Sequence, residues 1–428
     1  MLSVVPRIVI SCTIALAVTL SPQPPADARG ADTPPRSATA SAATGGVVLD
    51  GWGGIHAFGG ASISTAGAPY WSGWDIARSL RLQPGGAGGW VLDGYGGIHA
   101  FGGASPIATP AYWSGWDIAR DLVVLADGRS GYLLDGYGGL HPFGAALALA
   151  GVPYWSGWDI ARGLALHLNA GGQPDGGWLL DGYGGIHSFG AAPSWPSSHY
   201  VPGLDVWRHL HATSAAGGIM VGRWGIVDSV GSTPGIPWSG MPDWGAWDIV
   251  RDVVPVNPQG GWSAQPVRVG GAAALMSAMQ SLDRRQRGVP ALTEDRSLDS
   301  IAGGSWTYNL TGCGGPAMTI PSRSADMLAR NYFAHEIAGC SGARYVFTTY
   351  ENALPWQSAG ENIAWRTDGT SVVDAAWRIN DQWLNSPEHL ANIVNRGFSR
   401  VGCGVAFSTG AYQGATGPLW VWTCEFTG

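Results

Sequence analysis

The sequence contains no lysine, and all 23 of its basic residues are arginine. This absence excludes a Walker-type phosphate-binding loop and a Schiff-base lysine, because both need a primary amine. Charged residues make up only 12% of the 428 residues, and the formal net charge is −7. A net acidic chain without a basic stretch argues against nucleic acid as a partner. The hydrophobic content of 45% argues against a chain that is disordered throughout.

Long hydrophobic runs are also scarce. The apolar run at residues 8–20 is too short to span a membrane comfortably. Arg7 precedes it, and Ala26-Asp27-Ala28 follows as a small-residue cleavage site. We therefore predict a signal peptide over residues 1–28, a disordered leader over 29–44, and a secreted mature protein without a membrane span. The alternative is an uncleaved membrane anchor.

Cysteine is rare, with 5 residues, of which Cys12 lies in the predicted signal peptide. The other four are Cys313, Cys340, Cys403 and Cys424, and an even number in an exported protein predicts two disulfides with three possible pairings. Cys403 and Cys424 each alternate in phase with apolar neighbours on a strand-like run. Two such strands would pair with their sulfurs facing each other, which favours Cys403–Cys424 and leaves Cys313–Cys340. A four-cysteine zinc site is the alternative, although the C-x-x-C spacing is missing.

Glycine, by contrast, is abundant at 67 residues, and much of it belongs to an internal repeat. One sequence motif, close to LDGYGGIHAFG, begins at Leu49, Leu92, Leu134 and Leu180, and a more divergent copy begins at Val221. A second phrase, close to YWSGWDIAR, alternates with it and carries the aspartates Asp75, Asp117, Asp159, Asp205 and Asp248, which are 42 to 46 residues apart. Five copies of a unit of this size indicate a closed repeat architecture.

Each unit is expected to fold into short strands. In residues 90–101, for example, glycines join two β runs as a tight hairpin. Four short strands in about 42 residues is the size of one β-propeller blade. We therefore predict a five-bladed β-propeller over residues 45–262, with Gly260-Gly261-Trp262 starting a strand that closes the ring. The repeats resemble those of WD-repeat propellers and, more closely, the Gly-rich, Phe-Gly-ending repeats of secreted bacterial propellers.

The repeats also share polar positions, and two interpretations of them stay open. In one, these side chains form hydrogen bonds that tie each blade together. In the other, they belong to equivalent sugar sites, in which Trp and Tyr faces stack on pyranose rings and the aspartates bind hydroxyls. Sixteen of the 23 tryptophans lie between Trp52 and Trp262. The histidines are His56, His99, His141 and His187, and they are not expected to share a metal because one per blade lies too far from the next.

From about residue 271 the hydrophobic period becomes helical. Three motifs follow, namely NYFAH at 331–335, AGENIA at 359–364 and WLNSPEHLANI at 383–393, and two β runs end the chain. These motifs and the strand VGCGV resemble the CAP superfamily, the secreted domain shared by cysteine-rich secretory proteins, venom antigen 5 and plant pathogenesis-related proteins. The resemblance implies an α-β-α sandwich over residues 271–428, joined to the repeats by a linker at 263–270.

The resemblance also implies a cleft with two histidines and two acidic residues. Carried over one by one, these are His335, Glu361 and His389, while the second glutamate falls near Ser386, so the set is incomplete. Two imidazoles and a carboxylate suit Zn²⁺ with an open position for water, or an acid and base for hydrolysis. The structural alternative is a buried hydrogen-bonded network. Glu388 lies nearby but out of register.

Together these patterns predict a multidomain fold, an all-β five-bladed propeller followed by an α-β-α sandwich. The expected function is extracellular binding rather than catalysis. The propeller would contact a cell-wall or environmental glycan, and the cleft would hold a small apolar ligand, lipid-like or sterol-like, or Zn²⁺. Two alternatives stay open: a metal-dependent hydrolase acting on peptide or cell-wall material, and a propeller that docks proteins beside a structural CAP domain.

Overall fold

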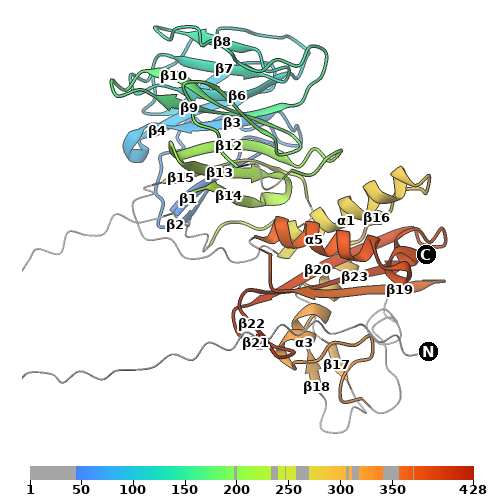
Figure 1. Cartoon of the computed structure of the whole chain (residues 1–428). Helices are drawn as coiled ribbons and strands as arrows, with labels where there is room; N and C mark the ends of the chain where they lie inside the picture. Colours follow the sequence, from blue (N-terminus) through green and yellow to red (C-terminus); the bar gives the residue numbers. More distant parts are fainter. Residues whose placement is uncertain are drawn as a thin grey trace, which may run out of the picture. The chain divides into compact units, whose positions relative to one another are not determined.

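The computed structural model describes residues 45–196, 200–232, 240–245, 247–256, 269–304, 308–310, 318–340, 356–369 and 371–428. The predicted signal peptide and leader lie outside these residues, as does most of the predicted linker. The described residues form many small sheets and few helices (Figure 1). None of the described helices is both long and apolar enough to cross a membrane.

The repeats fold into five three-stranded antiparallel sheets. Four of them take their strands in chain order: β3 (Ala77–Leu82), β4 (Gly88–Asp93) and β5 (Ile98–Gly102); β6 (Ala119–Val124), β7 (Gly131–Asp135) and β8 (Leu140–Phe143); β9 (Ala161–Leu168), β10 (Pro174–Asp181) and β11 (Ile186–Gly190); β12 (Trp207–Ser214), β13 (Gly217–Gly222) and β14 (Val227–Gly231). Short 3-10 turns lie at Pro84–Gly86 and Arg223–Gly225. Each described sheet has three strands where the sequence predicted four.

The fifth sheet joins the two ends of the repeat region. Its strands are β1 (Gly45–Asp50), β2 (Ile55–Gly59) and β15 (Val250–Val256), and β1 pairs with both of the others. The sequence placed the closing strand at residues 260–262, which lie outside the described residues. Among the described residues, β15 pairs with β1 and so joins the end of the repeat region to its beginning. The leading strands β3, β6, β9, β12 and β15 contact one another in a closed cycle.

The core of the repeat region lies between neighbouring sheets. Leu80 of β3 packs with Val47 and Leu49 of the preceding sheet, and Leu122 of β6 packs with Trp90 and Leu92 in the same way. The middle strands β1, β4, β7 and β13 are buried at every position. A strand covered on both faces buries all its side chains, and each large apolar side chain contributes about 1.5–3 kcal/mol.

The C-terminal region is built on one mixed sheet. Its order is β16 (Thr293–Glu294), β20 (Arg400–Ser408), β23 (Leu419–Thr427) and β19 (Ala359–Arg366). The helices are α1 (Val269–Gln286), α2 (Arg296–Ala302), α3 (Arg323–Ala329), α5 (Val372–Leu384) and α6 (Pro387–Ile393). Short strands β17 (Tyr308–Leu310), β18 (Met318–Ile320), β21 (Ala411–Tyr412) and β22 (Ala415–Thr416) complete it.

Helices cover both faces of this sheet (Figure 1). On one face, Trp422 and Phe426 of β23 share a core with residues of α1 and α5. On the other face, Val421 packs with Met327 of α3. Successive strand residues point to opposite faces, so β23 serves both cores at once. This arrangement has the α-β-α layering that the family resemblance implied.

The predicted disulfide between Cys403 and Cys424 is confirmed. The two residues face each other across β20 and β23 and are bonded. Cys340 is also disulfide-bonded, whereas Cys313 lies outside the described residues. Glycine alternates with cysteine in β20 because a Cβ atom on Gly404 would collide with the backbone at the end of α2.

Two carboxyl groups at β16 and α2 make the C-terminal region sensitive to pH. Burial raises the pKa of Glu294 to about 7, and burial with the charge of Glu294 raises the pKa of Asp299 to about 8. In an unfolded chain both groups titrate near pH 4, so their contribution to stability is present below that pH and is lost as the pH rises through 7 to 8. We expect the denaturation midpoint to fall between about pH 6 and about pH 9.

Asp299→Asn is the matched variant, because the amide oxygen still accepts the hydrogen bond from the Cys403 backbone N–H. The variant should show a smaller fall of the denaturation midpoint with pH. Urea denaturation at about pH 6 and about pH 9 measures this fall. An equally steep fall in the variant would show that another group is responsible.

Candidate functional site

Exposed aromatic side chains form similar clusters at four places in the repeat region, which we call the aromatic trios. In one trio the Tyr95 ring lies 5.9 Å from Trp74 and 6.4 Å from Tyr112. The others are Trp116, Tyr137 and Tyr154; Trp158, Tyr183 and Tyr200; and Trp247, Trp52 and Tyr70. The flanking rings are 40 to 60% exposed. Flat rings presented to solvent offer faces on which a ligand can stack.

Beside these rings, the repeated aspartates belong to a closed set of ion pairs, which we call the Arg–Asp ring. Each arginine pairs with the aspartate three residues before it and with the aspartate of the next repeat, and the last one, Arg251, pairs with Asp248 and with Asp75 of the first repeat. The other pairs join Arg78, Arg120, Arg162 and Arg208 to Asp75, Asp117, Asp159, Asp205 and Asp248. The ring borders a cavity of about 260 Å³.

The arginines favour the ionised form of four of these carboxyl groups. Burial acts to raise the pKa of Asp117, but its hydrogen bond and charge contacts with Arg78 and Arg120 outweigh burial and lower that pKa. The pKa values of Asp75, Asp159 and Asp205 are lowered by the same balance. Because the aspartate oxygens already accept bonds from arginine, the aspartates fit the structural interpretation better than the sugar-binding one.

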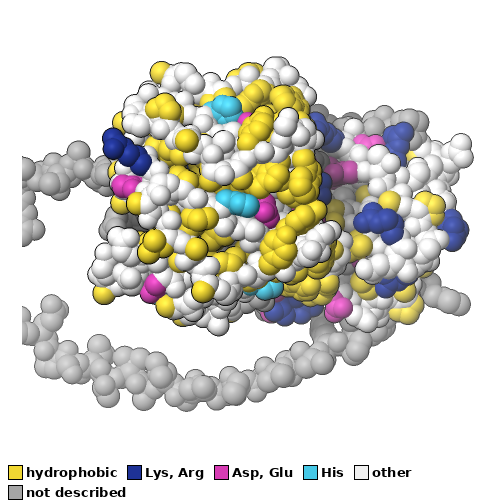
Figure 2. Space-filling model, turned by 90° about the horizontal axis from the view of Figure 1, so that it is seen from above, with side chains coloured by type: hydrophobic (Ala, Val, Ile, Leu, Met, Phe, Trp, Pro, Cys, Tyr) yellow, Lys and Arg dark blue, Asp and Glu magenta, His cyan; other side chains and the backbone are white. Residues whose placement is uncertain are grey.

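The repeated histidines hold the hairpins of their own sheets. Oδ2 of Asp93 lies 2.8 Å from Nε2 of His99, while Oδ1 accepts hydrogen bonds from the backbone N–H groups of Tyr95 and Gly97. His56, His141 and His187 repeat this contact with Asp50, Asp135 and Asp181. Trp71 packs edge-on against His99. Figure 2 shows histidines set at intervals among hydrophobic side chains. Their contacts within the fold are structural.

In the C-terminal region, Glu361 lies at the centre of a buried charge network. Its Oε1 accepts a hydrogen bond from Nε of Arg323 at 2.6 Å, and its Oε2 lies 2.6 Å from Nδ1 of His335. Arg323 is fully buried on α3 and also donates to the Tyr332 hydroxyl at 2.7 Å. Burial acts to raise the pKa of Glu361, but the Arg323 charge and the His335 hydrogen bond outweigh it and lower that pKa.

His389 reaches the same region from α6. Its Nδ1 lies 2.8 Å from the Ser386 hydroxyl, so Ser386 contacts the histidine at the position where a second glutamate was expected. Asn362 of β19 donates to the backbone oxygen of His389 at 3.1 Å, which ties α6 to the strand that carries Glu361. Burial, and then the nearby charge of His335, lower the pKa of His389. Its imidazole is therefore neutral at pH 7.

The structure thus joins His335 directly to Glu361 and ties His389 to the same strand. Sequence reasoning missed two buried charged residues of this region, Arg323 and Glu425. Glu425 faces Glu361 across β19 and β23, and both are buried. The sequence did offer a sign of Glu425, because side chains alternate between the two faces along residues 419–427. This alternation places Glu425 on the face opposite Cys424. No motif marked Arg323.

A metal ion held by His335, Glu361 and His389 does not fit this geometry. The Glu361 carboxylate is engaged by Arg323 and His335, and the ring nitrogen of His335 nearest to it is Nδ1. Among the described residues, three potential metal ligands have one ligand atom each within 4.8 Å of the others. They are His209, His211 and Asp252, and they lie in the repeat region. We therefore assign no metal ligation to the Glu361 carboxylate.

Comparisons with known proteins give a family for the C-terminal part. The sequence profile of the cysteine-rich secretory protein family, CAP, matches residues 322–426. A search of curated proteins finds no match. Similar solved structures include an extracellular SCP-domain protein from Bacillus anthracis (13% identity, TM-score 0.28, covering 81% of this chain and 88% of that one) and a cysteine-rich secretory protein from Staphylococcus aureus (9%, 0.24, 82% and 88%). An outer surface protein from Borrelia burgdorferi is a third (11%, 0.23, 36% and 91%).

Proposed function

Because the C-terminal part of this chain carries a CAP domain, we propose that the protein is an exported binding protein that its repeat region attaches to polysaccharide. In this proposal the five sheets are the blades of a five-bladed propeller. The closed cycle of leading strands and the closed Arg–Asp ring support that architecture. The CAP domain is then the part that the propeller holds at a glycan surface.

The aromatic trios carry the proposal. The four trios place aromatic rings at equivalent repeat positions, with Trp52 in one of them where the others have a central tyrosine, and the flanking rings are 40 to 60% exposed. Exposed tryptophan and tyrosine rings do not pack the core, so filling a blade does not account for them. A polymer with evenly spaced sugar rings can occupy several such clusters at once, which raises the overall affinity well beyond that of one cluster.

In the CAP domain we place the ligand beside His335 and His389. The His335 side chain is 50% exposed while its Nδ1 is held by Glu361, so its other ring nitrogen is available to a ligand. His389 is neutral and fixed by Ser386. Such a pair suits the polar end of a small apolar ligand, such as a hydroxyl or a carboxylate.

The test uses the full chain and the triple variant Trp74→Ala, Trp116→Ala, Trp158→Ala. Loss of three stacking faces should weaken retention on insoluble cell-wall polysaccharide by about tenfold or more. Retention is measured by co-sedimentation, with and without a competing simple sugar. Trp377→Ala is the matched control, because Trp377 is 43% exposed but lies on α5 in the CAP domain.

The control should bind like the unmodified chain. If the triple variant also binds normally, the polysaccharide proposal is wrong. If binding is lost but no sugar competes, the trios dock a protein instead.

A further inference from the structure

One position of the repeat departs from the fivefold regularity. The residue that follows each arginine of the Arg–Asp ring lies on a leading strand. No two neighbouring copies have the same residue there, and in chain order the five residues are Ser79, Asp121, Gly163, His209 and Asp252. The four side chains at this position are fully buried. Repeat positions that only fill the core are apolar and alike, as Leu80, Leu122, Leu164 and Leu210 are one residue later. The polar, varied position therefore has another role.

These polar side chains meet one another across the sheets. The Ser79 hydroxyl donates to Oδ1 of Asp121 at 2.8 Å, and Nε2 of His209 lies 2.7 Å from the same oxygen. His211, two residues along β12, joins them from the same strand face, and its ring stacks on that of His209 with centroids 4.4 Å apart. Each of these two histidines also points its Nε2 atom toward a second carboxylate.

That carboxylate is Asp252 on β15. Nε2 of His211 lies 2.8 Å from its Oδ1, and Nε2 of His209 lies 3.3 Å from its Oδ2. One ligand atom from each of the three residues falls within 4.8 Å of the others. We propose that His209, His211 and Asp252 bind a divalent transition-metal ion, of the kind that Zn²⁺ represents. Imidazole nitrogens with a carboxylate oxygen are the ligand set that these ions take in proteins.

The charge of the cluster favours a cation. Asp121 and Asp252 are both fully buried, and Arg81 is the guanidinium that faces them. Two buried carboxylates thus face a single guanidinium, so acidic side chains outnumber the arginine in this cluster. Buried charge is costly unless it is compensated, and a bound cation compensates it.

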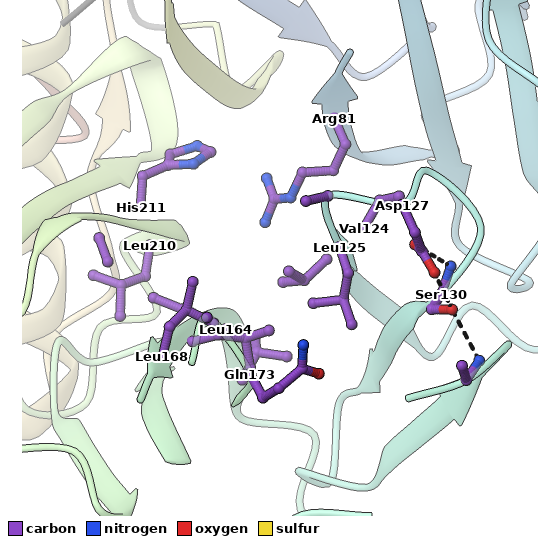
Figure 3. A pocket seen from close by; sticks show the side chains of 17 residues that line it. Arg81, Val124, Leu125, Asp127, Ser130, Leu164, Leu168, Gln173, Leu210 and His211 are labelled. Atoms are coloured by element: carbon purple, nitrogen blue, oxygen red, sulfur yellow. Dashed lines mark hydrogen bonds between the residues drawn. The ribbon is translucent and has the colours of Figure 1, made fainter. Parts of the chain in front are cut away.

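Arg81 is the competitor of the metal. Its guanidinium lies 3.0 Å from Asp121 but 3.6 Å from Asp252, and 3.3 Å from Nε2 of His209. Metal binding needs this guanidinium to leave Asp252 and His209 while it keeps Asp121. A cavity of about 410 Å³ borders both Arg81 and His211, with Leu164 and Leu210 in its wall (Figure 3). This cavity gives the Arg81 side chain room to turn away from Asp252 and His209.

The test measures metal on the full chain, purified without a histidine tag and stripped with a chelator. After equilibration with Zn²⁺ and gel filtration, we expect about one tightly bound ion per chain, and His211→Ala should lose it. His167→Ala is the matched control, because His167 lies in the same region but pairs with Asp175. His335→Ala is the second control, for the CAP domain. Both controls should keep the ion.

Co²⁺ binding gives a second measurement, which is made on the unmodified chain and on one variant. The unmodified chain should give the visible absorption of a Co²⁺ ion with nitrogen and oxygen ligands, and Arg81→Leu should tighten Co²⁺ binding because the competing cation is gone. The proposal is overturned if the unmodified chain binds no ion, if His211→Ala keeps it, or if His335→Ala loses it. It is also overturned if Arg81→Leu folds and binds Co²⁺ more weakly than the unmodified chain.

Discussion

Replacing Arg323 by methionine should destabilise the CAP domain by about 3–5 kcal/mol, because one partner of a buried ion pair is removed and the other stays. Arg323 is fully buried, and it donates to Glu361 and to the Tyr332 hydroxyl. Methionine fills much of the volume but leaves the Glu361 carboxylate, whose side chain is only 2% exposed, without its guanidinium partner. Guanidinium denaturation of the full chain, followed by tryptophan fluorescence, measures the shift.

Two variants make this result specific. The double variant Arg323→Met, Glu361→Gln removes both charges and should recover part of the loss, since no uncompensated charge is left buried. Arg378→Met is the surface control. Arg378 is 43% exposed in its ion pair with Asp374, so its loss should cost less than about 1 kcal/mol. If Arg323→Met and Arg378→Met had equal effects, the buried network would not stabilise the domain.

Removing the disulfide with Cys403→Ala and Cys424→Ala should have the second largest effect. The bond closes a loop with a sequence separation of 21, and both residues are fully buried. A loop of this size predicts a loss of about 3 kcal/mol from chain entropy, to which the two small cavities add. The denaturation midpoint under non-reducing conditions measures it.

A pair of valines separates these two contributions. Cys403→Val with Cys424→Val refills the space between the strands but restores no covalent link. Its midpoint should lie between those of the alanine pair and the unmodified chain. A valine pair as stable as the unmodified chain would mean that packing, and not the bond, gives the stability.

Features that depend on local order were predictable from the sequence. The cysteine pairing followed from alternation in two strands, and the number of repeats followed from their spacing. The CAP motifs marked the C-terminal domain, and they marked His335 and Glu361, which the structure brings into contact.

Features that depend on curvature between sheets were not predictable in the same way. Arg78 meets Asp117 because β3 and β6 of successive sheets lie in contact, and no distance along the chain encodes that contact. The grouping of His209, His211 and Asp252 was missed for a related reason. The histidines that stand out in the sequence are those that recur from repeat to repeat, whereas this cluster lies at a position where the repeats differ. Arg323 was missed because a buried arginine leaves no periodic pattern.

The pairing of β15 with β1 has a consequence for how such a chain changes over generations. Repeats arise by duplication of a gene segment, and an open array lengthens easily because each new unit needs only a neighbour. Here the last strand completes the first sheet, so an added or deleted unit would leave Arg251 and Asp75 out of reach of each other. Closure therefore ties the number of units to the fit between the first unit and the last. The fifth copy, in which Asp228 stands at the histidine position, differs from the others while it still supplies the strand that joins the ends.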